Sequence, residues 1–336
     1  MERLKKNLIL ALGLGVAVYL TLAIFSGLDE LRAALADFDY RLIPAILGLV
    51  AFSYVVRFVR WAYYLRLLRV RMPLAKNATI FAAGLSMTIS PGKLGEVLKS
   101  VFIKDVTGAP VARTAPAVVA ERATDGTGMV IWGLLGALAF DFGPWVLLAF
   151  LAITVVGIAM LRSKKLSLLA ERVLERLPLL NKLAPHVGTF HGASNELLAL
   201  RPLVVGTAIS FACWGLEILA VYLCSVGVGA QIPFLMVVFI FAVSSLAGAL
   251  FFTPGGIGVA EAGLAGMFGT VAGLSRGPAV ALTFIIRLAT LWFAALVGIA
   301  GLFVVRRVVG EPIERVADRA VASADAGPGS GGDREL

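Results

Sequence analysis

Long apolar runs separated by short polar segments make up most of the chain, and this pattern predicts a bundle of membrane-crossing helices. Several runs reach the roughly 20 apolar residues that an α-helix needs to cross a bilayer. Two runs are instead broken and followed by a shorter return, which indicates helical hairpins. The expected spans, with each hairpin given as two arms, are Asn7–Leu28, Leu42–Leu65, Asn77–Ser90 with Leu94–Ile103, Val111–Phe140, Trp145–Leu161, Leu203–Val226, Ile232–Phe252 with Val259–Val271, and Pro278–Val305.

The two breaks have nearly the same sequence. The first reads Ser90-Pro91-Gly92-Lys93-Leu94-Gly95, and the second reads Thr253-Pro254-Gly255-Gly256-Ile257-Gly258. Proline lacks the backbone donor that a helix needs, and glycine adopts conformations that other residues avoid. Within a membrane, such breaks occur where the freed backbone groups meet protein, water or ligand. Paired breaks at corresponding points of two halves therefore point to a transport site, and we expect the hairpins to meet and line a polar groove.

Composition supports a membrane protein over a nucleic-acid-binding one. Of the 336 residues, 59% are apolar, and the mean hydropathy is +0.92. The formal net charge is +9, but the basic residues gather at the ends of the expected spans. Membrane topology and anionic lipid head groups explain that placement, and no RNA- or DNA-binding motif accompanies it.

Loop charges predict how the chain is oriented. Basic residues are concentrated in 66–76, in 162–201 and directly after the last span, whereas the loop 29–39 is acidic. Cytoplasmic loops carry the excess of Lys and Arg, so we expect both termini to lie in the cytoplasm and the protein to lie in the cell membrane.

This orientation requires the first hairpin to enter from the cytoplasm and the second from the outside. The expected fold is therefore an all-α polytopic membrane protein with two inverted-topology repeats, each containing a broken hairpin. The repeats cover about 41–141 and 202–305 within a transmembrane domain 1–308, and 309–336 is expected to be a disordered cytoplasmic tail. The segment 162–201 joins the repeats. Its leucines recur at helical spacing, which predicts an amphipathic helix on the membrane surface or a plain connector.

Charged side chains within spans are costly and are usually functional or paired. They are Arg57, Arg60, Lys93, Glu96, Lys99, Glu121, Arg122, Asp125, Glu217, Glu261 and Arg287. The densest group is Glu121, Arg122 and Asp125, where the two carboxylates share a helix face and Arg122 lies three residues before Asp125. This group is either a neutralised structural ion pair or a site for a head group or coupling ion. If the halves are inverted repeats, Lys93, Glu96 and Arg287 converge on it.

Residues next to the breaks have alternative roles. Lys93 follows the first Pro-Gly pair, where free N–H groups and a cation can hold a phosphate together, or it extends to the cytoplasmic interface. The second break has Gly256 in place of Lys93. Glu96 and Glu261 lie at different offsets from their breaks, and either can pair with an arginine, take up a proton or meet a cationic head group. Glu217 has no evident partner in the sequence.

These motifs resemble the lysylphosphatidylglycerol synthase transmembrane-region family, also called flippase-like domain proteins. The resemblance rests on 90–96, on Glu121-Arg-x-x-Asp125 and on 253–261, and it extends over roughly residues 5–308. In the multiple peptide resistance factor, a similar membrane domain moves aminoacylated phosphatidylglycerol between leaflets, and a separate soluble domain makes that lipid. The resemblance implies translocation of an anionic or aminoacylated phospholipid, or another phosphate-bearing lipid, without the synthase domain.

In this interpretation, cations attract the lipid phosphate and carboxylates balance them or hold a cationic head group. The cations are Lys93, Arg122 and Arg287, and the carboxylates are Glu96, Glu121, Asp125 and Glu261. No ATPase, hydrolase or zinc motif is recognisable in the sequence, so we expect no catalytic activity, cofactor or metal. Two alternatives stay open. One is a membrane enzyme acting on a lipid or polyprenyl phosphate with Glu121 or Asp125 as base, and the other is a membrane partner of a separate synthase.

Overall fold

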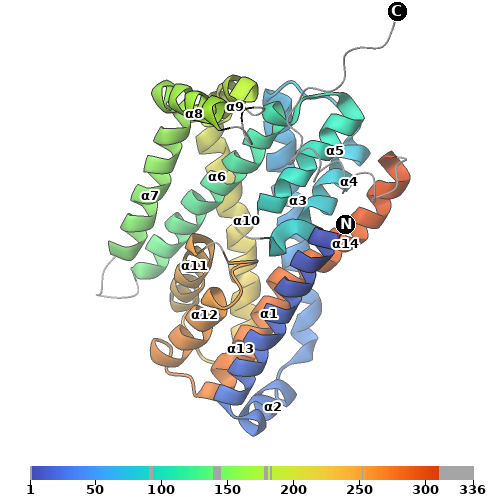
Figure 1. The fold of residues 1–336 in the computed structure, drawn as a ribbon. Helices are drawn as coiled ribbons and strands as arrows, with labels where there is room; N and C mark the ends of the chain where they lie inside the picture. The colour runs from blue at the N-terminus through green and yellow to red at the C-terminus, as the bar shows by residue number, and fades with distance from the viewer. Residues whose placement is uncertain are drawn as a thin grey trace, which may run out of the picture.

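The computed structural model describes residues 2–90, 94–138, 145–177, 181, 184–251 and 253–309. Every regular element within these ranges is helical, as the sequence predicts, and the helices form an elongated bundle (Figure 1). The predicted features at Pro91, Gly92 and Lys93 lie outside the described residues. So does the predicted tail beyond residue 309.

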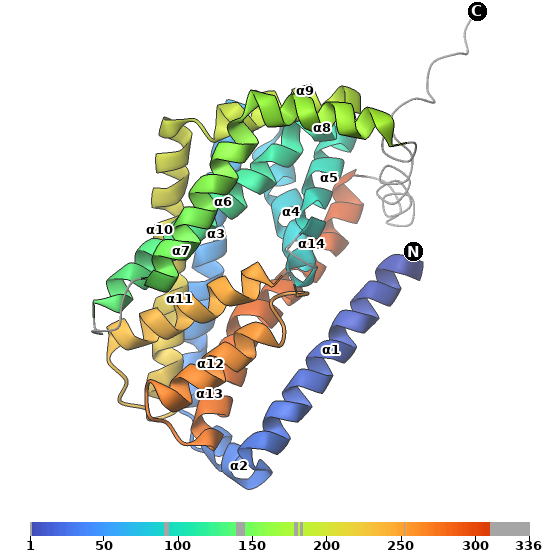
Figure 2. The same cartoon turned by 60° about the vertical axis from the view of Figure 1, so that its left-hand side comes forward.

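The first half of the chain follows the predicted order of a span, a broken hairpin and a further span. Its helices are α1 (Glu2–Ser26), α2 (Leu28–Ala36), α3 (Ile43–Leu67), α4 (Leu74–Leu85), α5 (Leu98–Thr107) and α6 (Val111–Ala137). Short 3-10 segments, Ser86–Ile89 and Leu94–Val97, flank the first break. Figure 2 shows α1 along one side of the bundle, where it contacts α2 and α13 (Arg276–Arg287).

The second half has the same order of elements. It consists of α10 (Leu200–Gly227), α11 (Phe234–Leu250), α12 (Val259–Thr270), α13 and α14 (Phe293–Val309). A π-helical segment, Leu288–Trp292, joins α13 to α14. Between the halves lie α7 (Trp145–Arg162), α8 (Lys164–Arg176) and α9 (Ala184–Leu197). The chain bends by 69° between α7 and α8, so α8 turns away from the direction of the spans.

Helix lengths separate the spans from the hairpin arms. Within the described residues, three helices are long and apolar enough to cross a bilayer, namely Tyr40–Leu67, Leu200–Gly227 and Arg276–Val305. The arms α4, α5 and α12 have 12, 10 and 12 residues, well short of the roughly 20 that a crossing requires, and α11 is the longest arm with 17. These lengths agree with hairpins that enter and return.

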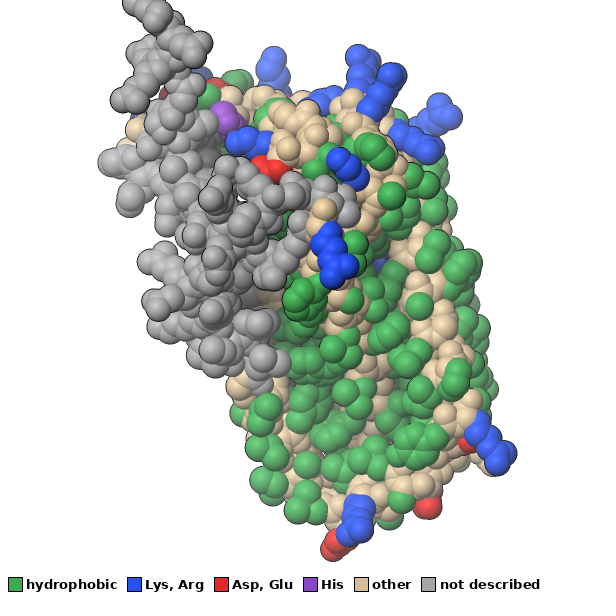
Figure 3. Space-filling model, turned by 90° about the vertical axis from the view of Figure 1, so that its right-hand side faces the viewer, with side chains coloured by type: hydrophobic (Ala, Val, Ile, Leu, Met, Phe, Trp, Pro, Cys, Tyr) green, Lys and Arg blue, Asp and Glu red, His purple; other side chains and the backbone are tan. Residues whose placement is uncertain are grey.

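The outer surface matches a membrane environment. On the face in Figure 3, hydrophobic side chains form a broad belt between two charged ends. Lys and Arg gather mainly at the end where α8 and α9 lie. Large apolar side chains such as Phe52, Val59, Val155 and Phe303 are exposed on the bundle, and so extended an apolar surface is rare on a soluble monomer. The chain is therefore a multi-pass helical membrane protein.

The first arm of each hairpin packs against a helix of the other half. Helix α4 of the first half lies against α14 of the second, α11 of the second lies against α6 of the first, and α3 packs on α10. Glycines allow the backbones to approach closely in both of these contacts. A Cβ on Gly136 of α6 would lie 2.6 Å from the backbone nitrogen of Phe239, and a Cβ on Gly298 of α14 would overlap the backbone of Ser86. This reciprocal packing is what an inverted repeat predicts, and the repeat relationship itself stays a prediction.

Candidate functional site

The two chain breaks meet inside the bundle. Ile89 before the first break and Ile257 in the second pack with Leu291 of the π segment in one buried apolar cluster. A Cβ on Gly255 would lie 3.5 Å from the Cα of Ile89. Gly255 has a φ of +61°, which side chains rarely permit, and Gly256 and Gly258 are likewise left-handed. The expectation that the hairpins meet is confirmed.

Ser90 holds the two sides of the first break together. Its hydroxyl donates to the carbonyl oxygen of Met87 at 2.6 Å and accepts from the N–H of Gly95 at 2.9 Å. A Cβ on Gly95 would lie 2.8 Å from that hydroxyl oxygen, so Gly95 leaves room for the contact. Ser90 thus satisfies a backbone donor that the interrupted helix leaves free.

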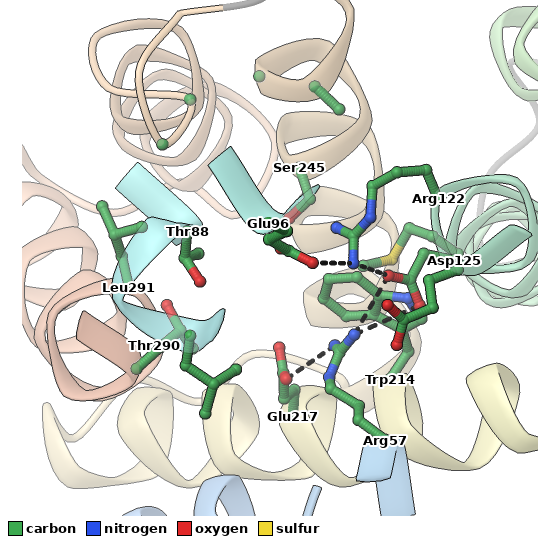
Figure 4. A pocket seen from close by; sticks show the side chains of 18 of the residues that line it. Arg57, Thr88, Glu96, Arg122, Asp125, Trp214, Glu217, Ser245, Thr290 and Leu291 are labelled. Atoms are coloured by element: carbon green, nitrogen blue, oxygen red, sulfur yellow. Dashed lines mark hydrogen bonds and ion pairs between the residues drawn. The ribbon is translucent and has the colours of Figure 1, made fainter. Parts of the chain in front are cut away.

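A cavity of about 500 Å³ lies where the breaks meet. Both hairpins line it, the first with Ser90 and Glu96 and the second with Thr253, Gly255 and Gly256. Figure 4 shows that its wall is divided. The labelled charged side chains and Trp214 gather on one side, and Thr88, Thr290 and Leu291 lie on the other, while Arg287 also lines the cavity.

The carboxylates of α6 anchor the charged side. Asp125 lies 2.6 Å from Arg60 of α3 and also accepts a hydrogen bond from Ser210 of α10 at 2.7 Å. Glu121 lies 2.6 Å from the Lys99 ammonium and 3.8 Å from Arg60. Arg60 and Glu121 are almost completely buried, so their pairing offsets a desolvation cost of several kcal/mol per ion.

Arg122 and Glu96 close these contacts into a ring of alternating charge. Arg122 lies 3.1 Å from Asp125 and 3.4 Å from Glu96, and Glu96 lies 3.4 Å from Lys99. The ring therefore joins α3, α5, α6 and the 3-10 turn after the first break. Because Glu96 and Lys99 belong to the hairpin, movement of its return arm would open the ring.

Arg57 extends the ring toward α10. Its guanidinium lies 3.3 Å from Asp125 and 2.9 Å from Glu217, and it stacks 4.5 Å from the centre of the Trp214 ring. Glu217 also accepts a hydrogen bond from Ser53 at 3.0 Å. The ring and this extension contain four cations and four carboxylates, so the described network is electrically balanced.

A separate ion pair holds the second break. Arg287 at the end of α13 donates to Glu261 at 2.7 Å and to the carbonyl oxygen of Gly255 at 2.7 Å. Glu261 also accepts from the N–H of Gly258 at 2.7 Å, which caps the start of α12. Tyr19 of α1 donates to Glu261 at 3.4 Å. Arg287 therefore stabilises the backbone around the second break.

The predicted convergence of charges holds for part of the set. Glu96, Glu121, Arg122 and Asp125 are in one network, and the predicted contact between Arg122 and Asp125 forms. Arg287 lines the same cavity but pairs with Glu261, not with that network. Lys93 lies outside the described residues.

Four further residues of the charged network are recognisable in the sequence as charges within spans, but the sequence did not assign them to the site. They are Arg57, Arg60, Lys99 and Glu217. The spacing of Arg57 and Arg60 places both on one helix face, a signal that could have drawn attention to α3. The partner of Glu217 lies 160 residues away, and no local pattern could reveal it.

Comparison with known proteins finds a matching family model and relatives that align with most of this chain. The family model described as "Lysylphosphatidylglycerol synthase TM region" matches residues 9–298. A UPF0104 membrane protein of Pyrococcus horikoshii is 24% identical over 323 residues, covering 88% of this chain and 96% of the relative. A UPF0104 membrane protein of Methanothermobacter thermautotrophicus is 24% identical over 318 residues, covering 86% and 93%. Another from that organism is 26% identical over 306 residues, covering 85% and 90%.

Proposed function

Because this chain belongs to the family of the lysylphosphatidylglycerol synthase TM region, we propose that it moves a phosphate-bearing lipid between the two leaflets of a membrane. The proposed substrate class is an anionic or aminoacylated phospholipid. The family description connects the fold to such a lipid, and the matched part is the membrane region. The proposal does not include ATP hydrolysis.

The observation that carries the proposal is the divided cavity between the two breaks. A lipid has a charged head group and apolar chains, and the cavity offers ion-paired side chains on one side and Leu291 with two threonines on the other (Figure 4). Hairpins that contact each other beside their breaks, as Ile89 and Gly255 do, can exchange access between two sides of a membrane. Sites formed by interrupted helices at repeat interfaces are typical of transporters.

Arg122 is the cation best placed to meet a head-group phosphate. Its side chain is 30% exposed, compared with 12% for Arg287, 10% for Arg57 and 3% for Lys99. A guanidinium presents a planar fork of donors that matches a phosphate. The other cations of the network, Arg57, Arg60 and Lys99, balance the buried carboxylates.

The inverted repeat and the orientation belong to the same proposal. The basic end near α8 and α9 is assigned to the cytoplasm because basic loops remain on that side. The first hairpin then enters from the cytoplasm and the second from the opposite side. Alternating movement of the two hairpins around the shared cavity would carry the head group across while the acyl chains stay in lipid.

The test is leaflet exchange in liposomes containing the purified full chain. Fluorescent phosphatidylglycerol and its lysylated form should exchange faster than in empty liposomes. Arg122→Gln should slow exchange about tenfold or more, since hydrogen bonds to charged groups contribute about 1.5–3 kcal/mol. The matched control is Arg113→Gln, which lies on α6 like Arg122 and breaks a peripheral pair with Glu196 of α9. Exchange at the empty-liposome rate for every such lipid would refute the proposal.

A membrane enzyme is the second candidate, favoured by the word synthase in the family description. Its candidate bases are Glu121 and Asp125, but each makes a 2.6 Å contact with a cation. Product formed by the purified protein and abolished by Asp125→Asn would revive this candidate. Co-purification with a separate synthase in the absence of lipid exchange would instead favour a partner role.

A further inference from the structure

Helices α6 and α11 diverge from a close contact and form a wedge that opens toward the two breaks (Figure 2). At the closed end, a Cβ on Gly136 would lie 2.6 Å from the backbone nitrogen of Phe239, and a Cβ on Gly133 would lie 3.1 Å from the Cβ of Ala242. Helices approach closely in a membrane where such small residues meet. Nearer the breaks, residues of both helices line the cavity.

The return arm of the first hairpin lies across the open end of this wedge. Helix α5 packs mainly on α4 and α6, whereas α11 packs mainly on α6, α10 and α12. Helix α7 covers another flank of α6, where a Cβ on Gly126 would lie 3.4 Å from the Oγ1 atom of Thr154. The cavity therefore has a rim formed by α6, the end of α11 and the turn 94–97 after the first break.

This rim is largely apolar and is accessible from outside the bundle. Val97 and Val119 are half-buried, and Ala249 is exposed, although all three line the cavity. Deeper in the same cavity, Phe241 and Leu246 are buried. The cavity therefore reaches the surface through side chains that suit contact with hydrocarbon.

Arg122 lies beside this rim and deep within its span. It shares a helix face with Val119, three residues before it on α6. At about 1.5 Å per residue, α6 extends roughly 17 Å before Arg122 to Val111 and roughly 22 Å after it to Ala137. Both lengths exceed half of a hydrocarbon core about 30 Å thick. A side chain that is 30% exposed and charged at such a depth is rare and marks a ligand pathway.

We propose that the acyl chains of the transported lipid pass out of the cavity between α6, the end of α11 and the turn 94–97, while the lipid phosphate pairs with Arg122. This inference rests on the proposed function, because it requires a lipid phosphate in the cavity. A guanidinium followed outward by an apolar rim matches the order of groups in a phospholipid. A water-soluble phosphate ester would gain nothing from that rim. The substrate therefore enters sideways from the bilayer, and its chains contact Val119 and Ala249.

Narrowing the rim tests this passage. Ala249→Trp adds a large side chain at the exposed end of α11, so it should slow exchange of fluorescent phosphatidylglycerol in liposomes about tenfold by raising the barrier to chain movement. Leu250→Trp is the matched control and should leave the rate unchanged, because Leu250 is exposed but is not among the described residues that line the cavity. Equal rates for the two variants would contradict the passage and leave the proposed function in place. No exchange by the unmodified protein would contradict both.

Photolabelling gives a second readout that does not need a bulky substitution. Phosphatidylglycerol with a diazirine at the end of an acyl chain should label peptides that contain Val119 and Ala249 in the unmodified full chain. Arg122→Gln should reduce that labelling several-fold, because the lipid loses the partner of its phosphate. Labelling at Val155, which is exposed on α7, reports the surrounding lipid and should stay constant. Rim labelling that is absent, or that Arg122→Gln leaves unchanged, would show that no bound lipid extends its chains through the rim.

Discussion

Lys99 on the return arm of the first hairpin places its ammonium 2.6 Å from the Glu121 carboxylate on α6. The stem of Lys99 crosses α4 at Gly84, where a Cβ would lie 2.5 Å from the lysine Cγ. The ammonium lies 4.3 Å from the centre of the Trp61 ring on α3. One lysine thus connects both arms of the hairpin to two spans of the bundle.

Replacing Lys99 should destabilise the protein strongly. Lys99→Met fills a similar volume but leaves the Glu121 carboxylate buried beside the more distant Arg60. Loss of one partner from a buried ion pair costs about 3–5 kcal/mol, because the remaining charge is uncompensated. Thermal unfolding in detergent, followed by tryptophan fluorescence, should therefore show a clearly lower midpoint than for the unmodified protein.

The matched control removes both charges. Lys99→Met combined with Glu121→Gln leaves no unpaired ion between these positions, and it should recover much of the lost stability. Equal stability of the single and double variants would contradict the assignment of the loss to the uncompensated buried charge of Glu121. Packing against Trp61 and Gly84 would then explain the role of Lys99.

Arg287→Gln should loosen the second break while leaving the remote end of α13 intact. The substitution removes the ion pair with Glu261 and the hydrogen bond to Gly255, each a charge-assisted contact with a net contribution of about 1.5–3 kcal/mol. Hydrogen exchange should rise in 255–262. Arg276→Gln is the control, because Arg276 is exposed at the start of the same helix and stacks on Phe25. A similar rise in both variants would indicate general weakening of α13.

The fold was predictable from sequence to the extent that it depends on local pattern. The spans, the two hairpins and the helical connector follow from apolar run length, Pro-Gly breaks and the spacing of leucines. After the second break, Val259–Val271 was predicted and Val259–Thr270 is found, whereas after the first the predicted arm Leu94–Ile103 is a 3-10 segment, Leu94–Val97, followed by α5, which ends at Thr107. The separate α2 was not predicted, although Gly27, with a φ of +80°, marks the point where α1 ends.

The sequence predicted which residues belong to the site better than it predicted which of them form ion pairs. A charge within a span requires a partner, so the sequence indicated which side chains matter. It did not indicate that Arg57 pairs with Glu217 or that Lys99 pairs with Glu121, because these contacts depend on how α3, α5, α6 and α10 cross. Local spacing did predict the pair of Arg122 with Asp125, because both lie on α6.

Gly136→Ala should destabilise the contact between α6 and α11. Alanine favours a helix over glycine by about 1 kcal/mol, but the added methyl group would lie 2.6 Å from the Phe239 backbone nitrogen. Backbone cannot move aside as a flexible side chain can, and overpacking typically costs about 1–3 kcal/mol, so the net effect should be a lower unfolding midpoint.

The control for this prediction is Gly157→Ala on α7. Nothing lies within 4 Å of the position that its Cβ would take, so helix propensity acts alone and stability should stay equal or rise. Both variants are compared by thermal unfolding in the same detergent. A midpoint for Gly136→Ala at or above that of the unmodified protein would contradict the close approach of α6 and α11.

Helix α8 should lie in the membrane interface with its leucine-rich face toward lipid. The helix has no buried residue, and large apolar side chains such as Leu169 and Val173 are exposed along it. An amphipathic helix of this kind gains stability by placing that face among acyl chains.

A fluorophore attached through Leu169→Cys should be quenched by lipid-borne spin labels, and one attached through Glu175→Cys, on the opposite face, by aqueous iodide. The native Cys213 and Cys224 are buried, so labelling of the unmodified protein measures the background. Equal iodide quenching at both positions would instead identify 162–201 as a plain connector.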